Sequence, residues 1–447
     1  MHRLIARWHV VVSGMVIVAI CATLLAVGIL RTTATPAKAD SLSAQVVLDW
    51  NINAVSAVRS SVPTKIQIEG LVYMAYTQAA VYDAVTKIAG RYAPYHDFTA
   101  DPTGASVEAA VISAAYHTLV AYLGDPGLVL QGKYTAALAA LPAAGKAEGI
   151  AVGQAASDDI VALRAHDGRN AVITTPYGKG PLAPGLWIFA PPPSGQVPVT
   201  PWMAFMQPFM LQSATQFRVA PPPALTSTLF ADDFNELKAF GSKTSTVRTP
   251  EQTAVAFFWA ANVINQEEQA LRDMTSTHHF DLVDTARALA MGSLVESDAG
   301  IACWDSKYFY QFWRPITAIQ NAGLTGNPDL TADPTWTPLG ITPAHPEYPS
   351  AHGCLTGASA EVYANLLHTE RINVDIPGAQ GGASTLTTSR HFDTVHDLDA
   401  EIMDARVWIG FHYRNSVRVG VDLGQDVANW DLARYFQPVG PGEGNGS

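Results

Sequence analysis

Several features are scarce or missing in this 447-residue sequence, and each excludes a class of protein. Only three cysteines occur, and they do not form the closely spaced pairs that a structural zinc site needs. No stretch alternates polar and apolar residues for long enough to predict a β-strand, and no segment repeats. Positive charge is in deficit, since 27 lysines and arginines against 39 acids leave a net charge of −12. This sign argues against a nucleic-acid partner.

Only one apolar run is long enough to cross a bilayer, and it lies at the N-terminus. Two arginines precede the run over residues 10–30, and Ala37-Lys38-Ala39 follows it. This order predicts a secretory signal peptide over 1–39, cleaved after Ala39, although the run would also suffice as an uncleaved anchor. We therefore expect an exported protein over 40–447 that has no stable membrane association. Cleavage would change the net charge from −12 to −16.

The remaining chain has the pattern of helices, which predicts an all-α fold with bundle-like packing in one domain. Apolar residues recur at intervals of three to four in the first part, and Thr249-Pro250-Glu251-Gln252 predicts a capping box with proline at N1. The motif-bearing half should cover about 249–435. The helices that we expect cover most of 51–163, 249–271, 282–312, 350–368 and a stretch from 393 that carries Arg406.

A proline-rich segment interrupts this pattern. Between Ile173 and Ser227 lie twelve of the 29 prolines, and they favour extended, irregular chain. The segment also holds many large apolar residues, so it does not have the composition of a disordered linker. We expect it to wrap the helical core and to help form the mouth of a site around 173–227.

Two segments place anion-binding groups close together in the sequence. Lys307 and Arg314 are seven residues apart, which predicts two cations on one face of a helix, roughly 10 Å apart. Ser350, in Tyr348-Pro349-Ser350-Ala351-His352, precedes an apolar run, and the free N–H groups behind such an N-cap residue favour a phosphate-like anion.

A third segment runs from Arg406 to His412. It offers a fork-shaped donor and, past a glycine, an imidazole that could attack or ligate. Taken singly, Lys307 and Arg314 are typical of solvated helices, and His352 and His412 are typical of structural histidines. Their order and spacing together carry the argument.

Lys-x6-Arg-Pro, Pro-Ser-x-His and Arg-x5-His, in this order, resemble the signature of the vanadium-dependent haloperoxidases and the type 2 phosphatidic acid phosphatase superfamily. Segments outside the motifs also look like the secreted bacterial members of the haloperoxidase branch, namely 76–85, 185–217, 248–259 and 288–319. The resemblance implies an all-α fold and a vanadate cofactor, whose site phosphate can also occupy.

The resemblance also implies a role for each motif residue. Lys307, Arg314 and Arg406 would bind the equatorial oxygens of vanadate, helped by Ser350 and the backbone of Ala351. His412 would supply the axial bond to vanadium, and His352 would act as acid and base. Trp304 and Tyr348 match positions that line the pocket, and His345 matches one that is associated with halide preference. Polarisation of the bound oxidant would fall to Lys307.

The sequence departs from the motifs at two positions, and one pair of cysteines allows two states. Ala351 stands where the motif usually has glycine, and Ser416 stands where phosphatases of the superfamily place an aspartate that orients the second histidine. Cys303 and Cys354 adjoin the first two motif segments, so either a disulfide or two buried thiols are expected.

The sequence thus supports three hypotheses. The first is a vanadate-dependent haloperoxidase that oxidises halide with hydrogen peroxide, bromide rather than chloride given His345, in the presence of small organic acceptors. The second is a secreted acid phosphatase that uses His412 as nucleophile and His352 as acid. The third is an exported anion-binding protein without catalysis, against which the presence of both histidines argues.

Overall fold

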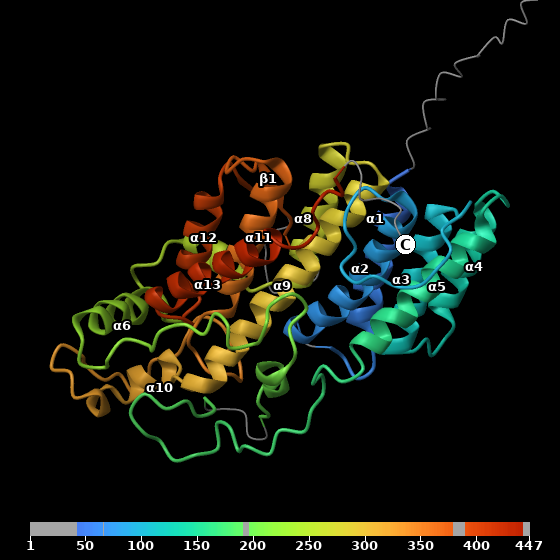
Figure 1. The fold of residues 1–447 in the computed structure, drawn as a ribbon. Helices are drawn as coiled ribbons and strands as arrows, with labels where there is room; N and C mark the ends of the chain where they lie inside the picture. The colour runs from blue at the N-terminus through green and yellow to red at the C-terminus, as the bar shows by residue number, and fades with distance from the viewer. Residues whose placement is uncertain (1–42, 66, 191–195, 379–388, 441–447) are drawn as a thin grey trace, which may run out of the picture. The chain divides into compact units, whose positions relative to one another are not determined.

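The computed structural model describes residues 43–440 except 66, 191–195 and 379–388, so the predicted signal peptide lies outside the described residues. Thirteen α-helices and one two-stranded sheet occur in the described part, which confirms the all-α prediction (Figure 1). None of the helices described is long and apolar enough to cross a membrane. The irregular loops and two short 3₁₀ helices, Pro201–Phe205 and Ala322–Thr325, connect the α-helices.

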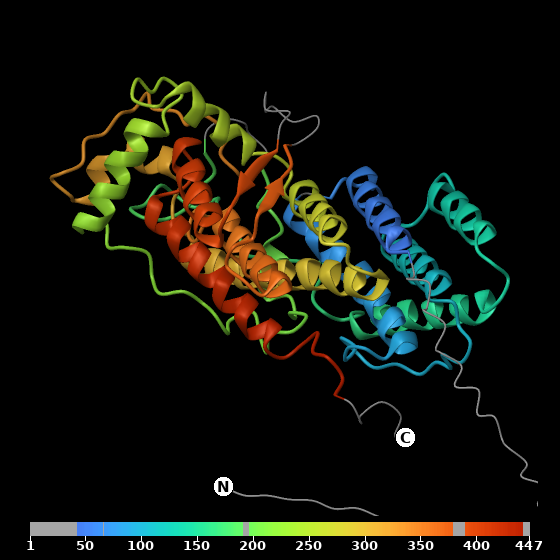
Figure 2. The same cartoon turned by 90° about the horizontal axis from the view of Figure 1, so that it is seen from above.

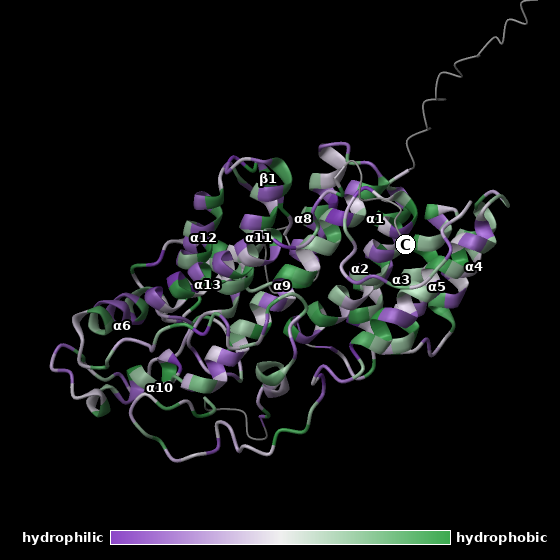
Figure 3. Cartoon of the chain, in the orientation of Figure 1, coloured by the Kyte–Doolittle hydropathy of each residue, from purple (hydrophilic) through white to green (hydrophobic). Residues whose placement is uncertain are grey.

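Helices α1, α3 and α5 pack against α2, which is buried along most of its length, and α4 packs against α3. Gly149 and Gly153 bring α5 against the backbone of α3, since a Cβ on Gly153 would lie 2.3 Å from the carbonyl oxygen of Ala110. Figure 3 shows hydrophobic residues along α2 and α3. The helices are α1 (Gln45–Ser60), α2 (Gln67–Ala89), α3 (Val107–Leu123), α4 (Val129–Ala140) and α5 (Lys146–Leu163).

Helix α9 (Leu282–Tyr310) runs through the middle of the described helices, as both Figure 1 and Figure 2 show. It packs against α2, α8, α11 and α13. A helix that is surrounded in this way needs apolar or small residues on every side, which explains why its buried positions show little amphipathic pattern. Helix α9 ends with the turn that carries Lys307.

The helix expected over 249–271 forms as two helices, α7 (Pro250–Phe258) and α8 (Val263–Thr277). The predicted capping box at Thr249 is present, with Gln252 as its reciprocal partner. The sequence did not predict the break between these two helices. Asn262 caps α8 with its side chain, but the apolar pattern continues across this position and hides that signal.

The C-terminal helices hold the second and third motif segments. Glycines on α11 (Ala351–Leu367) and α13 (Arg414–Leu432) let their backbones touch: a Cβ on Gly357 would lie 2.6 Å from the carbonyl oxygen of Val421. Helix α12 (Val395–Trp408) packs against both. The remaining elements are α6 (Thr228–Phe240), α10 (Pro315–Gln320) and the antiparallel strands β1 (Val374–Ile376) and β2 (Arg390–Phe392).

The described part of the proline-rich segment wraps the core, as expected. The carbonyl oxygen of Val199 accepts hydrogen bonds from the Trp304 indole and the Tyr308 hydroxyl, at 3.1 and 2.7 Å. Arg218 forms a two-pronged ion pair with Asp305 on α9. These contacts hold the proline-rich segment against the end of α9 that carries the first motif.

Candidate anion site

Ser350 is the N-cap residue of α11, as predicted, but its hydroxyl does not cap the helix. The Ser350 N–H donates to the carbonyl of Ser416 on α13, 3.0 Å away, and the Ser350 Oγ is buried without a hydrogen-bond partner. The close packing of α11 on α13 therefore fixes where the helix N-terminus lies and leaves one buried hydroxyl free for a ligand.

Lys307 and Arg314 do not share a helix, which corrects the prediction that both project from one helical face. Helix α9 ends at Tyr310 because Gln311 adopts a left-handed conformation, with φ of 47°. Arg314 then occupies the N-cap position of α10 in extended conformation. The two cations still approach the same region, because the chain turns back after α9.

The Lys307 ammonium already has three acceptors. It donates to the backbone carbonyls of Pro346, Glu347 and Pro349, which uses all three of its N–H groups. Burial lowers the pKa of Lys307 to about 8, with the charge of Arg314 acting in the same direction. In this arrangement Lys307 contributes its charge, and a direct contact with an anion requires it to release a carbonyl.

Arg314 contacts two of the histidines that were predicted to belong to the site. Its Nη1 lies 3.3 Å from Nε2 of His412, and its Nη2 lies 3.0 Å from Nδ1 of His345. The ring of His345 also lies against that of Trp304, with centroids 5.1 Å apart. Burial and the nearby cations hold the pKa of His345 and of His412 well below the ordinary histidine value, so both rings are neutral near pH 7.

Glu347 is the functional residue that sequence reasoning missed. Its Oε1 lies 2.9 Å from Nδ1 of His412 and accepts a 3.1 Å hydrogen bond from the N–H of Tyr413. Burial raises the pKa of Glu347 to about 7, although Lys307 and Arg314 oppose that shift. One signal was available: Glu347 is the only acid in the stretch 334–360.

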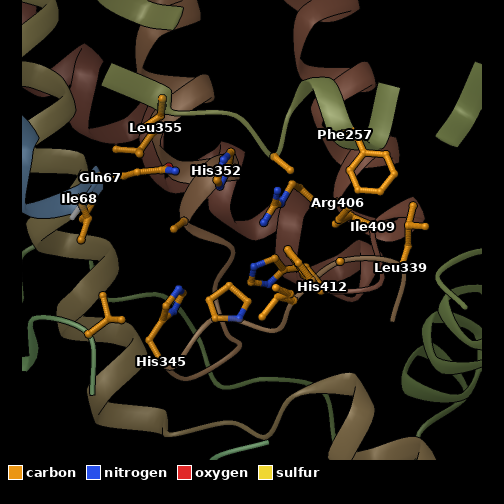
Figure 4. A pocket seen from close by; sticks show the side chains of 18 of the residues that line it. Gln67, Ile68, Phe257, Leu339, His345, His352, Leu355, Arg406, Ile409 and His412 are labelled. Carbon is orange, nitrogen blue, oxygen red and sulfur yellow. The ribbon is translucent and has the colours of Figure 1, made fainter. Parts of the chain in front are cut away.

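A cavity of about 630 Å³ opens beside these groups. His345, His352, Arg406 and His412 point toward one another across it in Figure 4. Lys307, Arg314 and Ser350 lie behind this lining rather than on it. The other residues of the wall are mostly apolar and come from distant segments, among them Ile68, Phe257, Leu339, Leu355 and Ile409.

Three unpaired polar atoms around the cavity fit an oxyanion. Ser350 Oγ, His352 Nε2 and Arg406 Nε are buried and have no hydrogen-bond partner. Buried polar atoms are normally paired, so these three atoms, two on the cavity lining and Ser350 Oγ behind it, indicate a missing partner. The donors and the cations suit a tetrahedral oxyanion such as vanadate, and the neutral His412 would offer a ring nitrogen to its central atom.

The balance of charge also favours an anion. Lys307, Arg314 and Arg406 are all buried, and burial lowers the pKa of each. Within the described residues, Glu347 is the only carboxylate that opposes this shift for Lys307 and Arg314. Removing cations from water costs free energy unless a counter-charge is present, and a bound anion would supply it.

Other predicted site residues are placed differently. Ala351 and Trp304 line the cavity, but Tyr348 does not: its hydroxyl donates to the carbonyl of Ala220, and its ring packs with Phe312. The side chain points to the opposite side of the Pro349 segment, which a sequence motif cannot reveal. Cys303 and Cys354 are both buried and free, so the alternative of two thiols describes this structure.

The sequence of this chain is similar to those of known proteins. Residues 287–440 match the family model of the VCPO second helical-bundle domain. The vanadium chloroperoxidase of Curvularia inaequalis is 24% identical over 319 residues, which cover 55% of this chain and 52% of that protein. The chain thus spans about half the length of that curated relative.

Two solved structures share the fold over most of the chain. A bacterial vanadium-dependent iodoperoxidase superposes with a TM-score of 0.74 at 21% identity, covering 90% of this chain and 98% of the other. A holo-type bacterial vanadium-dependent chloroperoxidase gives 0.66 at 18% identity, covering 82% and 91%. Residues 287–440 therefore resemble the VCPO second helical-bundle domain, and the chain shares the fold of these bacterial vanadium-dependent haloperoxidases.

Proposed function

We propose that this protein is a vanadate-dependent haloperoxidase. It would catalyse the reaction of halide with hydrogen peroxide and a proton to give hypohalous acid and water, so that two electrons pass from the halide to the peroxide. The observation that carries the proposal is the set of unpaired buried atoms at the cavity. His352 Nε2 and Arg406 Nε belong to residues that line the cavity together with His412, and Ser350 Oγ lies behind this lining.

Each motif residue has a role that its position supports. His412 would hold vanadium through Nε2, while Arg314, Arg406, Ser350 and the backbone of Ala351 would bind the oxygens. When bound, vanadate supplies a Lewis-acidic centre that activates hydrogen peroxide without a change in its own redox state. The remaining charge comes from Lys307.

His352 is suited to proton transfer. Its pKa lies well below the ordinary value because it is buried beside Arg406 and Lys307, so the ring is neutral and its Nε2 has no partner. It can therefore accept a proton from an incoming peroxide and return it to the leaving oxygen. The apolar cavity wall excludes water and strengthens the electrostatic contacts inside.

Bromide is the proposed halide, in preference to chloride. The support is His345, which lines the cavity, lies against Trp304 and contacts Arg314. The related proteins are named for chloride and iodide, so all three halides belong in the test.

A phosphatase is the second candidate, and the contact between Glu347 and His412 favours it. The missing aspartate at Ser416 argued against a phosphatase, because a nucleophilic imidazole benefits from an orienting carboxylate. Glu347 supplies such a carboxylate from another part of the chain. Attack of His412 Nε2 on phosphorus, with His352 protonating the leaving group, would then be feasible.

One paired assay distinguishes the two. The purified protein is given hydrogen peroxide with bromide, iodide or chloride and a phenol-type dye, before and after orthovanadate is added, and p-nitrophenyl phosphate is tested in parallel. Halogenation that depends on vanadate supports the haloperoxidase. Phosphate hydrolysis that vanadate inhibits, without halogenation, would replace it with the phosphatase, and loss of both would leave an anion-binding protein.

Export is proposed on the sequence alone. The support is the pattern of arginines, apolar run and Ala37-Lys38-Ala39 in the first 39 residues. An N-terminus at Asp40 in protein recovered from the medium or the periplasm would agree with it, and an intact N-terminus in the membrane fraction would oppose it.

A further inference from the structure

The His412 ring is held between a cation and a carboxylate. Nη1 of Arg314 lies 3.3 Å from Nε2, and Oε1 of Glu347 lies 2.9 Å from Nδ1. A guanidinium can only donate hydrogen bonds, so Nε2 must accept from it. The single proton of the neutral ring is then on Nδ1, where it donates to Glu347. Both neighbours favour the same tautomer.

Glu347 is itself fixed in place. It is fully buried, and the oxygen that faces His412 also accepts the N–H of Tyr413. Its backbone carbonyl accepts a 2.9 Å hydrogen bond from Lys307. Because its side chain and its backbone are both held in place, Glu347 can fix the orientation of the His412 ring.

No other carboxylate in the described residues hydrogen-bonds to His412. The position four residues after His412 is Ser416, which has no carboxylate to orient the ring; its side chain lies near Glu347 and lowers the pKa of that carboxyl. Glu347 reaches the same ring from the loop ahead of α11, 65 residues earlier in the chain.

We propose that Glu347 is the positioning residue of the anion site: by accepting a hydrogen bond from Nδ1 of His412, it keeps Nε2 unprotonated, so that Nε2 can bond the central atom of a bound tetrahedral oxyanion. The inference rests on the proposed function only for the identity of that anion. It applies to vanadate and to phosphate alike, because both add a fifth ligand at the same place.

The first test measures the tautomer directly. The full-length protein is labelled with ¹⁵N-histidine, and the two ring nitrogens of His412 are identified by their loss in His412→Gln. We expect the proton on Nδ1 in the protein without anion. A proton on Nε2 would overturn the proposal without any change at Glu347.

Two variants of nearly equal volume then separate hydrogen bonding from packing. Glu347→Gln keeps a carbonyl oxygen that can accept from Nδ1, whereas Glu347→Leu fills the space without an acceptor. Loss of an orienting partner typically weakens binding by about 10- to 100-fold, so we expect this loss of inorganic phosphate affinity in the leucine variant. The glutamine variant should stay near the wild-type affinity.

The readouts keep the proposal apart from the proposed function. If folded Glu347→Leu binds phosphate as tightly as the wild type and keeps the Nδ1 proton, Glu347 does not position His412. If that variant fails to fold, a proton on Nε2 of His412 in the wild-type protein would still overturn the proposal. Neither measurement uses halide oxidation, so a failed halogenation assay would remove the haloperoxidase proposal and leave this one standing.

Discussion

Gly424 on α13 lies directly against the backbone of Cys354 on α11: a Cβ on Gly424 would be 2.1 Å from the Cys354 carbonyl oxygen. Three further glycines, Gly353, Gly357 and Gly420, allow close contacts along the same pair of helices, since a Cβ on each would lie 2.6 Å from a backbone carbonyl oxygen. This packing places the N-terminus of α11, and with it Ser350 and His352, beside the loop that carries His412.

Gly424→Ala should therefore damage both stability and the anion site. The added methyl group must push α11 from α13, and overpacking of this kind costs about 1–3 kcal/mol or more. Thermal unfolding and phosphate titration measure the two effects. Gly132→Ala on α4 is the matched control, because nothing lies within 4 Å of its Cβ, and it should stabilise the protein by about 0.5–1 kcal/mol. Equal behaviour of the two variants would contradict the packing argument.

The pH dependence of anion binding should follow Lys307. Its pKa of about 8 means that the ammonium is charged below pH 8 and loses its charge above it. We expect phosphate affinity to fall by up to about tenfold per pH unit above pH 8, since binding must then be coupled to proton uptake. Calorimetric titrations between pH 7 and 9.5 measure this. Lys307→Arg should move the fall to higher pH, and an unchanged profile in that variant would assign the titration to another group.

Asp399 should make the fold less stable as the pH rises. Burial raises its pKa from 3.8 to about 7, with the charge of Glu361 as the next cause. Below pH 4 the carboxyl is neutral in both states. Between pH 4 and 7 the unfolded chain ionises first, so stability falls and the full penalty, at most about 4 kcal/mol, applies above pH 7.

Asp399→Asn removes this penalty and keeps an oxygen for the hydrogen bond from Gln425. Its unfolding temperature should exceed that of the wild type at pH 8 and approach it at pH 4. The exposed Asp232→Asn controls for the loss of one negative charge at the surface. A gain of equal size at both pH values would show that ionisation of Asp399 is not the cause.

His345→Phe should raise the rate of chloride oxidation relative to bromide. The variant removes the ring nitrogens that contact Arg314 but keeps an aromatic face for Trp304. Initial rates with each halide at saturating peroxide give the ratio. His117→Phe, on α3 and outside the cavity lining, should leave it unchanged. An unchanged ratio in His345→Phe would show that this position does not determine the halide.

Local signals in the sequence predicted local structure well. Thr249, Pro250 and Gln252 specify their capping box within four residues, and the structure contains it. The motif residues also predicted that distant segments meet, and His352, Arg406 and His412 do line one cavity.

Features that depend on tertiary contacts were beyond the sequence. The left-handed Gln311 separates Lys307 from Arg314, and glutamine is not a residue that predicts such a turn. The contact of Glu347 with His412 spans 65 residues and belongs to no motif. The direction in which Tyr348 points depends on its packing against Phe312 and the proline-rich segment.

The most direct test of the account is the stoichiometry of vanadate binding to the wild-type protein and to His412→Ala. Equilibrium dialysis, with circular dichroism to confirm that the variant is folded, gives both values. We expect one vanadate per wild-type chain and loss of stoichiometric binding in the variant, because the axial bond depends on His412 Nε2. Stoichiometric binding that persists in folded His412→Ala would contradict the central claim that this histidine holds the cofactor.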